Sequence, residues 1–216
     1  MSLQSYQKDF FDFVITTQAL RFGQFVLKSG RISPYFFNTG LFSTGERVAR
    51  LGQYYAAAIV ASNQPFDMLF GPAYKGIPLV VATSIALAEK HGRDVPFAFN
   101  RKEVKDHGEG GVIVGSALAG RVLILDDVIS SGLSIGESIQ LIAGAGADPA
   151  GVVIAMDRQE KGRNERSAVQ DVVQQHGIPV NAVANVTQLT SYLEANPAHT
   201  QTVAQIKEYR REYGCE

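Results

Sequence analysis

The stretch that most constrains the fold is residues 120–138, GRVLILDDVISSGLSIGES. It opens with an unbroken run of branched apolar residues at 122–125, the pattern of a strand that is buried on both faces. Two carboxylates, Asp126 and Asp127, follow directly. In open α/β sheets the carboxyl ends of the strands face the ligand crevice, so carboxylates there can accept hydrogen bonds from sugar hydroxyls or lie near a metal. The stretch therefore predicts an α/β fold with a ligand site at the end of this strand.

A loop of small residues comes next and leads into a helical pattern. Backbone N–H groups and hydroxyls in such a loop, with the N-terminus of the following helix, can surround a phosphate. Acceptors for a diol beside a phosphate cradle indicate a ribose 5-phosphate. The loop residues that carry this expectation are Ser130, Ser131, Gly132, Leu133 and Ser134.

Two other phosphate-binding motifs do not fit. The stretch lacks the Gly-Lys-Ser/Thr ending of a P-loop. A second glycine-rich segment, GAGADPAG at 144–151, lacks the spacing of a dinucleotide fingerprint because Pro149 occupies the third glycine position. The alternative without a ligand is a buried strand that ends in a solvated aspartate pair before a capped helix.

Composition excludes several classes of protein. A chain of 216 residues with 45% hydrophobic content is long enough for one globular domain with a large core. The net charge is −1, from 20 basic and 21 acidic residues, which argues against nucleic acid or an anionic membrane as partner. No run approaches the roughly eighteen apolar residues that span a bilayer. The single cysteine, Cys215, excludes an internal disulfide framework and fits a reducing compartment. We therefore expect a cytoplasmic protein.

Apolar periodicity predicts alternating helices and strands along most of the chain. An amphipathic helix over the first twenty residues precedes a hairpin at 25–37 that turns at Ser29 and Gly30. Further helices are expected at 45–62, 77–91, 167–176, 187–196 and 197–213, and further strands at 66–70, 95–99, 151–158 and 179–186.

The segment 71–76, GPAYKG, follows the strand expected at 66–70. Its Gly-Pro start and its glycine end predict a tight, irregular loop before a helix. Lys75 can meet a pyrophosphate as a point charge, and the flanking glycines let the backbone approach closely. The alternative is an ordinary loop with a solvated lysine.

A basic, glycine-rich segment follows at 100–111, NRKEVKDHGEGG. Its composition predicts a mobile segment that could act as a lid over an anionic ligand. A solvated run of charges is the alternative. The nitrogen donors of this segment are Arg101, Lys102, Lys105 and His107.

Arg158 ends the strand expected at 151–158 and reaches the same sheet edge as the acidic pair. A guanidinium can pair with a carboxylate in bidentate fashion, which makes Arg158 a candidate for recognising an anionic ligand. A salt-bridged surface arginine is the alternative.

The stretch 120–138 resembles the phosphoribosyl pyrophosphate (PRPP) signature of type I phosphoribosyltransferases. Over essentially its whole length, the chain resembles the orotate phosphoribosyltransferase family. The resemblance rests on KSGR at Lys28, PYFFN at Pro34, GPAYKGIP at Gly71 and FNRKEVKDHGEGG at Phe99. It implies a type I phosphoribosyltransferase fold, in which helices flank a central, mainly parallel sheet. It also implies a single domain over 1–216, a small N-terminal hood within residues 1–44, and a flexible lid at 100–112.

The resemblance implies the transfer of a phosphoribosyl group from PRPP to orotate, giving orotidine 5-monophosphate and pyrophosphate in pyrimidine biosynthesis. It further implies Mg²⁺ as cofactor, held mainly by PRPP and water without a dedicated protein site. A homodimer in which each lid closes over the neighbouring subunit's site is also implied. Because no covalent nucleophile is needed, catalysis would come from preorganised charge and from lid closure that excludes water.

The resemblance assigns roles to residues at matching positions. Asp126 and Asp127 would bind the ribose hydroxyls, and the loop would hold the 5-phosphate. A strained peptide bond, with the cis form as one alternative, is expected near Ala73. The family usually has threonine at the position of Ser130 and often a hydroxyl residue at that of Leu133. The implied catalytic residues are Lys75, Arg101, Lys102, Lys105, His107, Asp126 and Asp127, and the substrate-binding set adds Lys28, Phe36, Phe37, Tyr74, Val128, Ile129, Ser130, Ser131, Gly132, Leu133, Ser134 and Arg158.

Two rival functions use the same signature. A non-enzymatic PRPP sensor would need the acidic pair and the phosphate loop, but neither the basic lid nor the aromatic pair at Phe36 and Phe37. A phosphoribosyltransferase for a neutral base would have no carboxylate for Lys28 and Arg158 to meet. The presence of all these residues favours the orotate enzyme.

Overall fold

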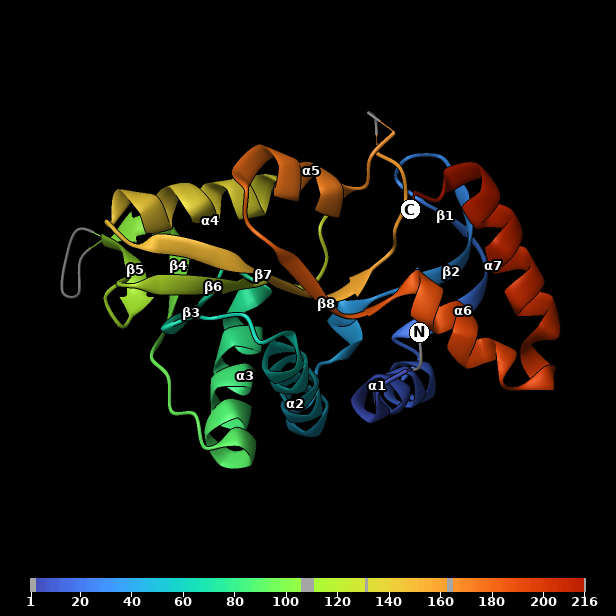
Figure 1. The fold of residues 1–216 in the computed structure, drawn as a ribbon, viewed down its shortest axis with the longest axis horizontal. Coiled ribbons are helices and arrows are strands. Elements are labelled where there is room, and N and C mark those ends of the chain that lie inside the picture. Colours follow the sequence, from blue (N-terminus) through green and yellow to red (C-terminus); the bar gives the residue numbers. More distant parts are fainter. Residues whose placement is uncertain (1–2, 106–110, 131, 163–164, 216) are drawn as a thin grey trace.

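The computed structural model describes residues 3–105, 111–130, 132–162 and 165–215. Its centre is a six-stranded sheet in the order β5-β4-β3-β6-β7-β8, parallel except for the β4–β5 pair (Figure 1). The prediction of a mainly parallel sheet is therefore confirmed. The strands are β3 (Met68–Gly71), β4 (Phe97–Lys105), β5 (Gly111–Gly115), β6 (Arg121–Leu125), β7 (Asp148–Asp157) and β8 (Val180–Asn185).

Helices cover both faces of this sheet. Figure 1 shows α2 (Gly45–Ser62) and α3 (Gly76–His91) on one face, and α4 (Leu133–Gly144) and α5 (Ala168–His176) on the other. Each face of the sheet has its own apolar core, and strand β6 contributes side chains to both. Leu123 and Leu125 join the cluster under α2 and α3, and Val122 and Ile124 join the cluster under α4. All four side chains have no exposed surface, which confirms the prediction of a strand buried on both faces.

The N- and C-terminal segments pack together at the β8 end of the sheet, and their apolar side chains join the core cluster under α2 and α3 (Figure 1). Helix α1 (Ser5–Thr16) leads to an antiparallel hairpin of β1 (Leu20–Val26) and β2 (Ile32–Phe37), which η1 (Thr39–Leu41) follows. The hairpin turns at Gly30, whose φ of +83° suits glycine. Helices α6 (Val186–Glu194) and α7 (Thr200–Tyr213), with η2 (Pro197–His199) between them, pack on this side (Figure 1). Among the residues that the structure describes, no helix has the length and apolar character required to cross a membrane.

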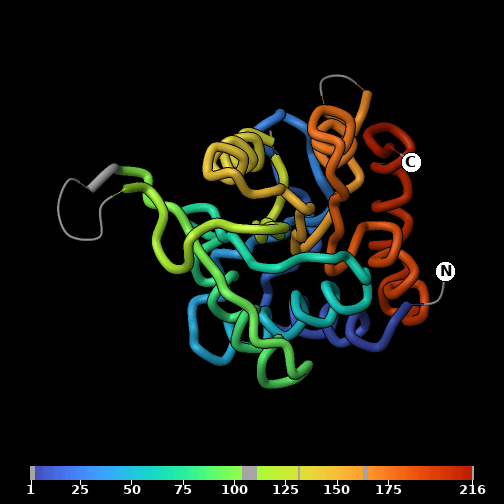
Figure 2. The backbone as a smooth tube through the Cα atoms, turned by 60° about the vertical axis from the view of Figure 1, so that its left-hand side comes forward, coloured from blue at the N-terminus to red at the C-terminus, as the bar shows by residue number. Residues whose placement is uncertain are grey.

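Two departures from the sequence-based prediction concern the hairpin and the predicted lid. The hairpin begins at Leu20 rather than at residue 25. Strand β4 continues to Lys105 and pairs antiparallel with β5, a strand that the apolar pattern did not reveal. Residues 100–105 and 111–112 of the predicted lid are therefore strand ends. Figure 2 shows these ends projecting from the body of the molecule, opposite both termini. Residues 106–110, including His107, lie outside the described residues.

Candidate active site

The backbone of the acidic pair is fixed from two sides at the end of β6. The N–H of Asp126 donates to the carbonyl of Val153, and the N–H of Ala155 donates to the carbonyl of Asp127, so β7 holds both residues. From α2, the fully buried Tyr55 donates its hydroxyl to the carbonyl of Asp126 at 2.7 Å. Tyr55 carried no signal in the sequence that distinguishes it from other core aromatics. The two carboxylates therefore project from a rigid support.

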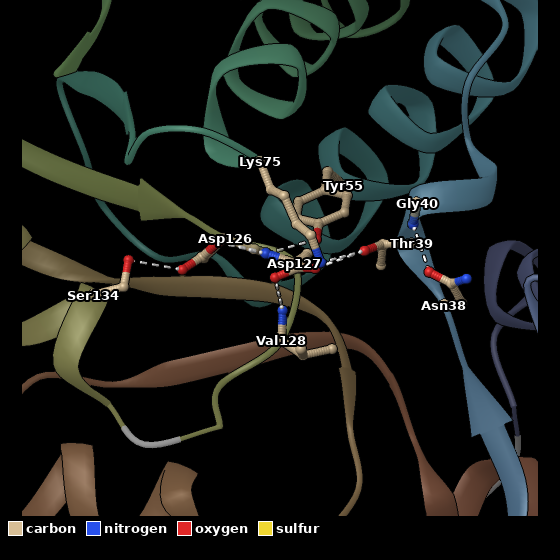
Figure 3. A network of polar contacts seen from close by, with 9 residues as sticks. All are labelled: Asn38, Thr39, Gly40, Tyr55, Lys75, Asp126, Asp127, Val128 and Ser134. Carbon is tan, nitrogen blue, oxygen red and sulfur yellow. Dashed lines mark hydrogen bonds and ion pairs between the residues drawn. The ribbon is translucent and has the colours of Figure 1, made fainter. Parts of the chain in front are cut away.

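The Asp127 carboxylate is held by three donors (Figure 3). Its Oδ1 accepts the backbone N–H of Val128 at 2.8 Å. Its Oδ2 accepts the Thr39 hydroxyl at 2.6 Å and the Lys75 ammonium at 2.5 Å. Lys75 Nζ also lies 3.2 Å from Thr39 Oγ1. The lysine that the sequence assigns to pyrophosphate thus contacts a carboxylate that it assigns to ribose.

The Asp126 carboxylate has a different environment. Its Oδ1 accepts the N–H of Asp127 at 2.9 Å, and its Oδ2 accepts the Ser134 hydroxyl at 3.2 Å. Burial disfavours the charged form and raises the pKa of Asp126 from 3.8 to about 6, and the negative charge of Asp127 adds to this effect. The hydrogen bonds from Asp127 and Ser134 and the charge of Lys75 oppose it. Near neutral pH, Asp126 is therefore an ionised carboxylate that burial makes a strong acceptor.

A cavity of about 270 Å³ joins the acidic pair to both predicted phosphate loops. Gly132, with a φ of +74°, lies at the N-terminus of α4, and the Leu133 side chain beside it is 72% exposed. Ser131 lies outside the described residues. The predicted site residues that line the cavity are Tyr74, Lys75, Asp126, Asp127, Val128, Ile129, Ser130, Gly132, Leu133 and Ser134.

The loop between β3 and α3 is bounded by Gly71 and Gly76, and a side chain at either position would collide with neighbouring backbone atoms unless the backbone moved. A Cβ on Gly71 would lie 2.2 Å from the carbonyl oxygen of Gly76. The peptide bond between Ala73 and Tyr74 is cis, one of the forms that the resemblance suggested. The N–H of Ala73 donates to Asn100 Oδ1 at 2.8 Å, so the first residue of the basic segment anchors this loop. Asn100 is a residue that the sequence reasoning missed.

The described part of the basic segment lies against the same loop. Lys102 Nζ is 5.0 Å from the centre of the Tyr74 ring, a cation–π contact. A second cavity, of about 540 Å³, includes Arg101 and Lys102 in its lining and shares Ala73 and Ser134 with the first. The structure thus brings two of the four predicted lid cations to the edge of the site.

The hairpin residues predicted to hold the base do not line the first cavity. Lys28 is exposed in the turn. Phe36 stacks on Phe25, with ring centres 5.5 Å apart, whereas Phe37 meets the core ring of Phe10 edge-on. The two aromatics therefore face opposite sides of the hairpin, and only Phe36 lies on the side away from the core.

Arg158 is paired within the described structure. Its Nε and Nη2 lie 2.9 and 2.6 Å from Glu160 Oε1, and Nη2 is 3.2 Å from Ser33 Oγ. The guanidinium also lies over the Tyr35 ring, 4.9 Å from its centre, and the Tyr35 hydroxyl donates to the same Glu160 oxygen. The salt-bridged alternative is therefore observed, although the Arg158 side chain is only 25% exposed. Sequence reasoning did not identify Glu160, because nothing in the stretch after Arg158 distinguishes it from other charged residues.

Comparison with known proteins defines the class first. The family model of the phosphoribosyl transferase domain matches residues 43–189, more than half of the chain and all of the first cavity's lining. The chain therefore has the fold of a phosphoribosyltransferase.

Closer relatives define the family. Orotate phosphoribosyltransferase of Cellvibrio japonicus is 55% identical over 214 residues, which is 99% of this chain and 100% of the relative. That of Nitrosococcus oceani is 56% identical over 215 residues, 99% of this chain and 98% of the relative. The crystal structure of orotate phosphoribosyltransferase from Francisella tularensis, 45% identical, superposes with a TM-score of 0.88 over 96% of this chain and 100% of that one. The chain belongs to the orotate phosphoribosyltransferase family, and the resemblance noted in the sequence is confirmed.

Proposed function

We propose that this chain transfers the 5-phosphoribosyl group of PRPP to orotate, giving orotidine 5-monophosphate and pyrophosphate in pyrimidine (UMP) biosynthesis. The observation that supports this most strongly is one cavity in which a buried acidic pair lies between two loops suited to phosphates. PRPP has phosphate groups on both sides of a diol, so it needs this order of donors and acceptors. Its acceptor is the substrate named in the family to which the chain belongs.

The roles of the cavity residues follow from their positions. Asp126 and Asp127 accept hydrogen bonds from the ribose hydroxyls. The 5-phosphate lies on the loop of Val128, Ile129, Ser130, Ser131, Gly132, Leu133 and Ser134, at the N-terminus of α4. Tyr74 and Lys75 face the pyrophosphate. The 72% exposed Leu133 side chain contributes no core packing, so the backbone N–H is what position 133 supplies.

Catalysis in this arrangement is electrostatic. Displacement at the anomeric carbon breaks its bond to pyrophosphate and forms a bond to a ring nitrogen of orotate, which loses its proton. The transition state carries positive charge on the ribose ring and negative charge on the leaving pyrophosphate. Lys75 and the lid cations Arg101, Lys102, Lys105 and His107 stabilise the leaving group, and the acidic pair fixes the sugar. Preorganised charges of this kind require little reorganisation at the moment of reaction.

Mg²⁺ is the cofactor that we propose. The carboxylates at the cavity are Asp126 and Asp127, and in the described part of the chain no group of three or more His, Cys, Asp or Glu side chains could hold a metal. Mg²⁺ commonly takes one or two carboxylates, several waters and the oxygens of a substrate phosphate. This donor set fits an ion carried mainly by PRPP and water. When bound, Mg²⁺ would neutralise negative charge on the pyrophosphate.

We also propose that the chain acts as a homodimer in the cytoplasm and that each lid serves the neighbouring subunit's site. The support is the projection of the β4 and β5 ends away from the body of the molecule (Figure 2). Mixed dimers test it: a lid variant combined with an acidic-pair variant should recover activity that neither homodimer has. Absence of recovery would mean that the lid acts within its own subunit.

For the base, we propose that Lys28, Phe36, Phe37 and Arg158 hold orotate. Within the described residues, the contacts of the Arg158 guanidinium to Glu160 and Ser33 use Nε and Nη2. The Nη1 group can then donate to the orotate carboxylate while Glu160 keeps the guanidinium in place. A neutral base would offer no partner to this cation.

The direct test is PRPP-dependent loss of orotate absorbance with purified protein and Mg²⁺, together with measurement of released pyrophosphate. Both signals should appear in equal amounts. Binding of PRPP without loss of orotate would support the sensor instead. Pyrophosphate release with uracil or a purine, but not with orotate, would support a different base.

A further inference from the structure

The Asp127 carboxylate has one oxygen that is fully occupied before any substrate binds. A carboxylate oxygen offers about two lone pairs. Oδ2 of Asp127 already receives two donors, Thr39 Oγ1 at 2.6 Å and Lys75 Nζ at 2.5 Å, as Figure 3 shows. A ribose hydroxyl can donate to this oxygen only if one of the two donors leaves.

Lys75 is the donor that can leave. Its side chain is 62% exposed and ends a flexible four-carbon chain at the start of α3. It lies in the loop between β3 and α3, where the proposed function places a pyrophosphate. The anionic charge of that group gives the ammonium a second partner and compensates for the loss of Asp127.

Thr39 is the donor that stays. It is a short side chain in η1, and its position is fixed by the residue before it. The Asn38 side chain caps the turn by accepting the N–H of Gly40 at 3.0 Å, and the Asn38 N–H donates to the carbonyl of Ala19 at 2.7 Å. The hydroxyl of Thr39 is therefore held in place by the hairpin and not by the ligand.

We propose that Thr39 is a positioning residue that fixes Asp127 for the ribose of PRPP, and that Lys75 is a temporary occupant of Asp127 Oδ2 that PRPP displaces. This rests on the proposed function. Once Lys75 has moved, Thr39 and the N–H of Val128 are the described groups that still orient the carboxylate, one on each oxygen. Removing the hydroxyl would leave Oδ2 free to turn away from the sugar.

Two substitutions and a control separate positioning from packing. Thr39→Val keeps the shape and removes the hydroxyl, and Thr39→Ser keeps the hydroxyl and removes the methyl group. Thr190→Val is the control, because the Thr190 hydroxyl is buried and bonded to the carbonyl of Val186 within α6. The measurements are the dissociation constant of PRPP with Mg²⁺ by calorimetry, and kcat/KM for PRPP and for orotate.

Thr39→Val should weaken PRPP binding and kcat/KM for PRPP by about tenfold to a hundredfold, the range for losing a hydrogen bond to a charged group. The KM for orotate at saturating PRPP should not change. Thr39→Ser should restore PRPP binding, and Thr190→Val should leave it at the wild-type value. Wild-type PRPP affinity in Thr39→Val, or equal loss in Thr39→Ser, would overturn the positioning role. Failure of the proposed function is distinguishable, because the wild-type protein would then not consume orotate.

Displacement of Lys75 has its own test, with ribose 5-phosphate as the probe. This ligand has the diol but no pyrophosphate to attract the ammonium, so in the wild-type protein it must compete with Lys75 for Asp127. In Lys75→Met it should bind about two- to fivefold more tightly, the range for a partly exposed ion pair, while PRPP binds more weakly. Weaker binding of both ligands would overturn the displacement.

Discussion

Asp126 offers a sharp test of the electrostatics of the site, because its ionisation is coupled to the stability of the whole fold. The residue is 8% exposed, and burial raises the pKa of its carboxyl from 3.8 to about 6. An Asp126→Asn substitution keeps the shape of the side chain and removes the ionisation. We therefore expect the stability difference between this variant and the wild type to depend on pH.

The size of the effect follows from the shift in pKa. Raising a pKa by about two units corresponds to about 3 kcal/mol, at roughly 1.4 kcal/mol per unit. Below pH 3.8 the carboxyl is protonated in both the folded and the unfolded chain. Between pH 3.8 and about 6 only the unfolded chain ionises, so the wild type loses stability as pH rises and the loss is complete above pH 6. The asparagine variant does not share this loss.

The assay is urea unfolding of both proteins without ligand at several pH values from 4 to 7.5. The free energy of unfolding of Asp126→Asn, minus that of the wild type, should rise by about 2.5 kcal/mol over this range, because the unfolded wild type is already partly ionised at pH 4. The altered hydrogen bonds of the amide add a difference in the free energy of unfolding that does not depend on pH, so they do not affect how that difference changes with pH. A difference that stays flat across the range would refute the claim that burial holds this carboxylate at elevated free energy.

Asp67 provides the control with the opposite sign. Its exposed carboxylate is bound by the Arg121 side chain at 2.8 and 3.0 Å, and these bonds hold its pKa well below the usual value. Its contribution to stability is therefore present above pH 3.8 and lost as the pH falls further. Asp67→Asn should show no change in its difference from the wild type between pH 5 and pH 7.5.

Three further substitutions test packing and the lid. Thr83 is buried, and its hydroxyl has no hydrogen-bond partner within the described residues. Thr83→Val should therefore stabilise the protein by about 1 kcal/mol in urea unfolding. Destabilisation would mean that the hydroxyl does have a hydrogen-bond partner. A Cβ on Gly52 would lie 2.5 Å from the backbone of Ala82. Gly52→Ala should therefore force α2 and α3 apart and lower the free energy of unfolding by about 3 kcal/mol in the same assay. An unchanged free energy of unfolding would contradict the close approach of the two helices. Lys105→Ala should lower kcat by about a hundredfold with an unchanged circular dichroism spectrum, and a near-normal rate would refute the lid hypothesis.

The strand at 122–125 and the acidic pair after it could be predicted because their signal is local. Alternate side chains of β6 enter two different cores, so every residue of the strand must be apolar until the sheet ends at Asp126. Strand β5 had no such signal. It lies at the edge of the sheet between two glycines, and its side chains are at most half-buried, so composition alone does not separate it from a loop.

The partners of the site residues were beyond prediction for a different reason. Thr39 bonds to Asp127, which is 88 positions away in the sequence, and Glu160 bonds to Arg158, which is 2 positions away. Neither Thr39 nor Glu160 belongs to a recurring sequence pattern. The contact of Thr39 with Asp127 exists because η1 follows the hairpin and lies beside the end of β6 (Figure 3). A hydroxyl that acts through another residue leaves no mark in a single sequence, so only the assembled fold identifies it.

Lys75 and Asp127 show what the strand order adds to the two charges. Strands β3 and β6 are neighbours in the sheet and run parallel, so the loop after β3 and the acidic pair after β6 emerge at the same edge. The Asp127 side chain is 9% exposed, and a buried carboxylate without a partner is costly. Lys75, a flexible cation in the neighbouring loop, therefore pairs with it. Groups of opposite charge that bind two parts of one substrate also pair with each other, so we expect substrate binding here to be an exchange of partners and not a simple addition.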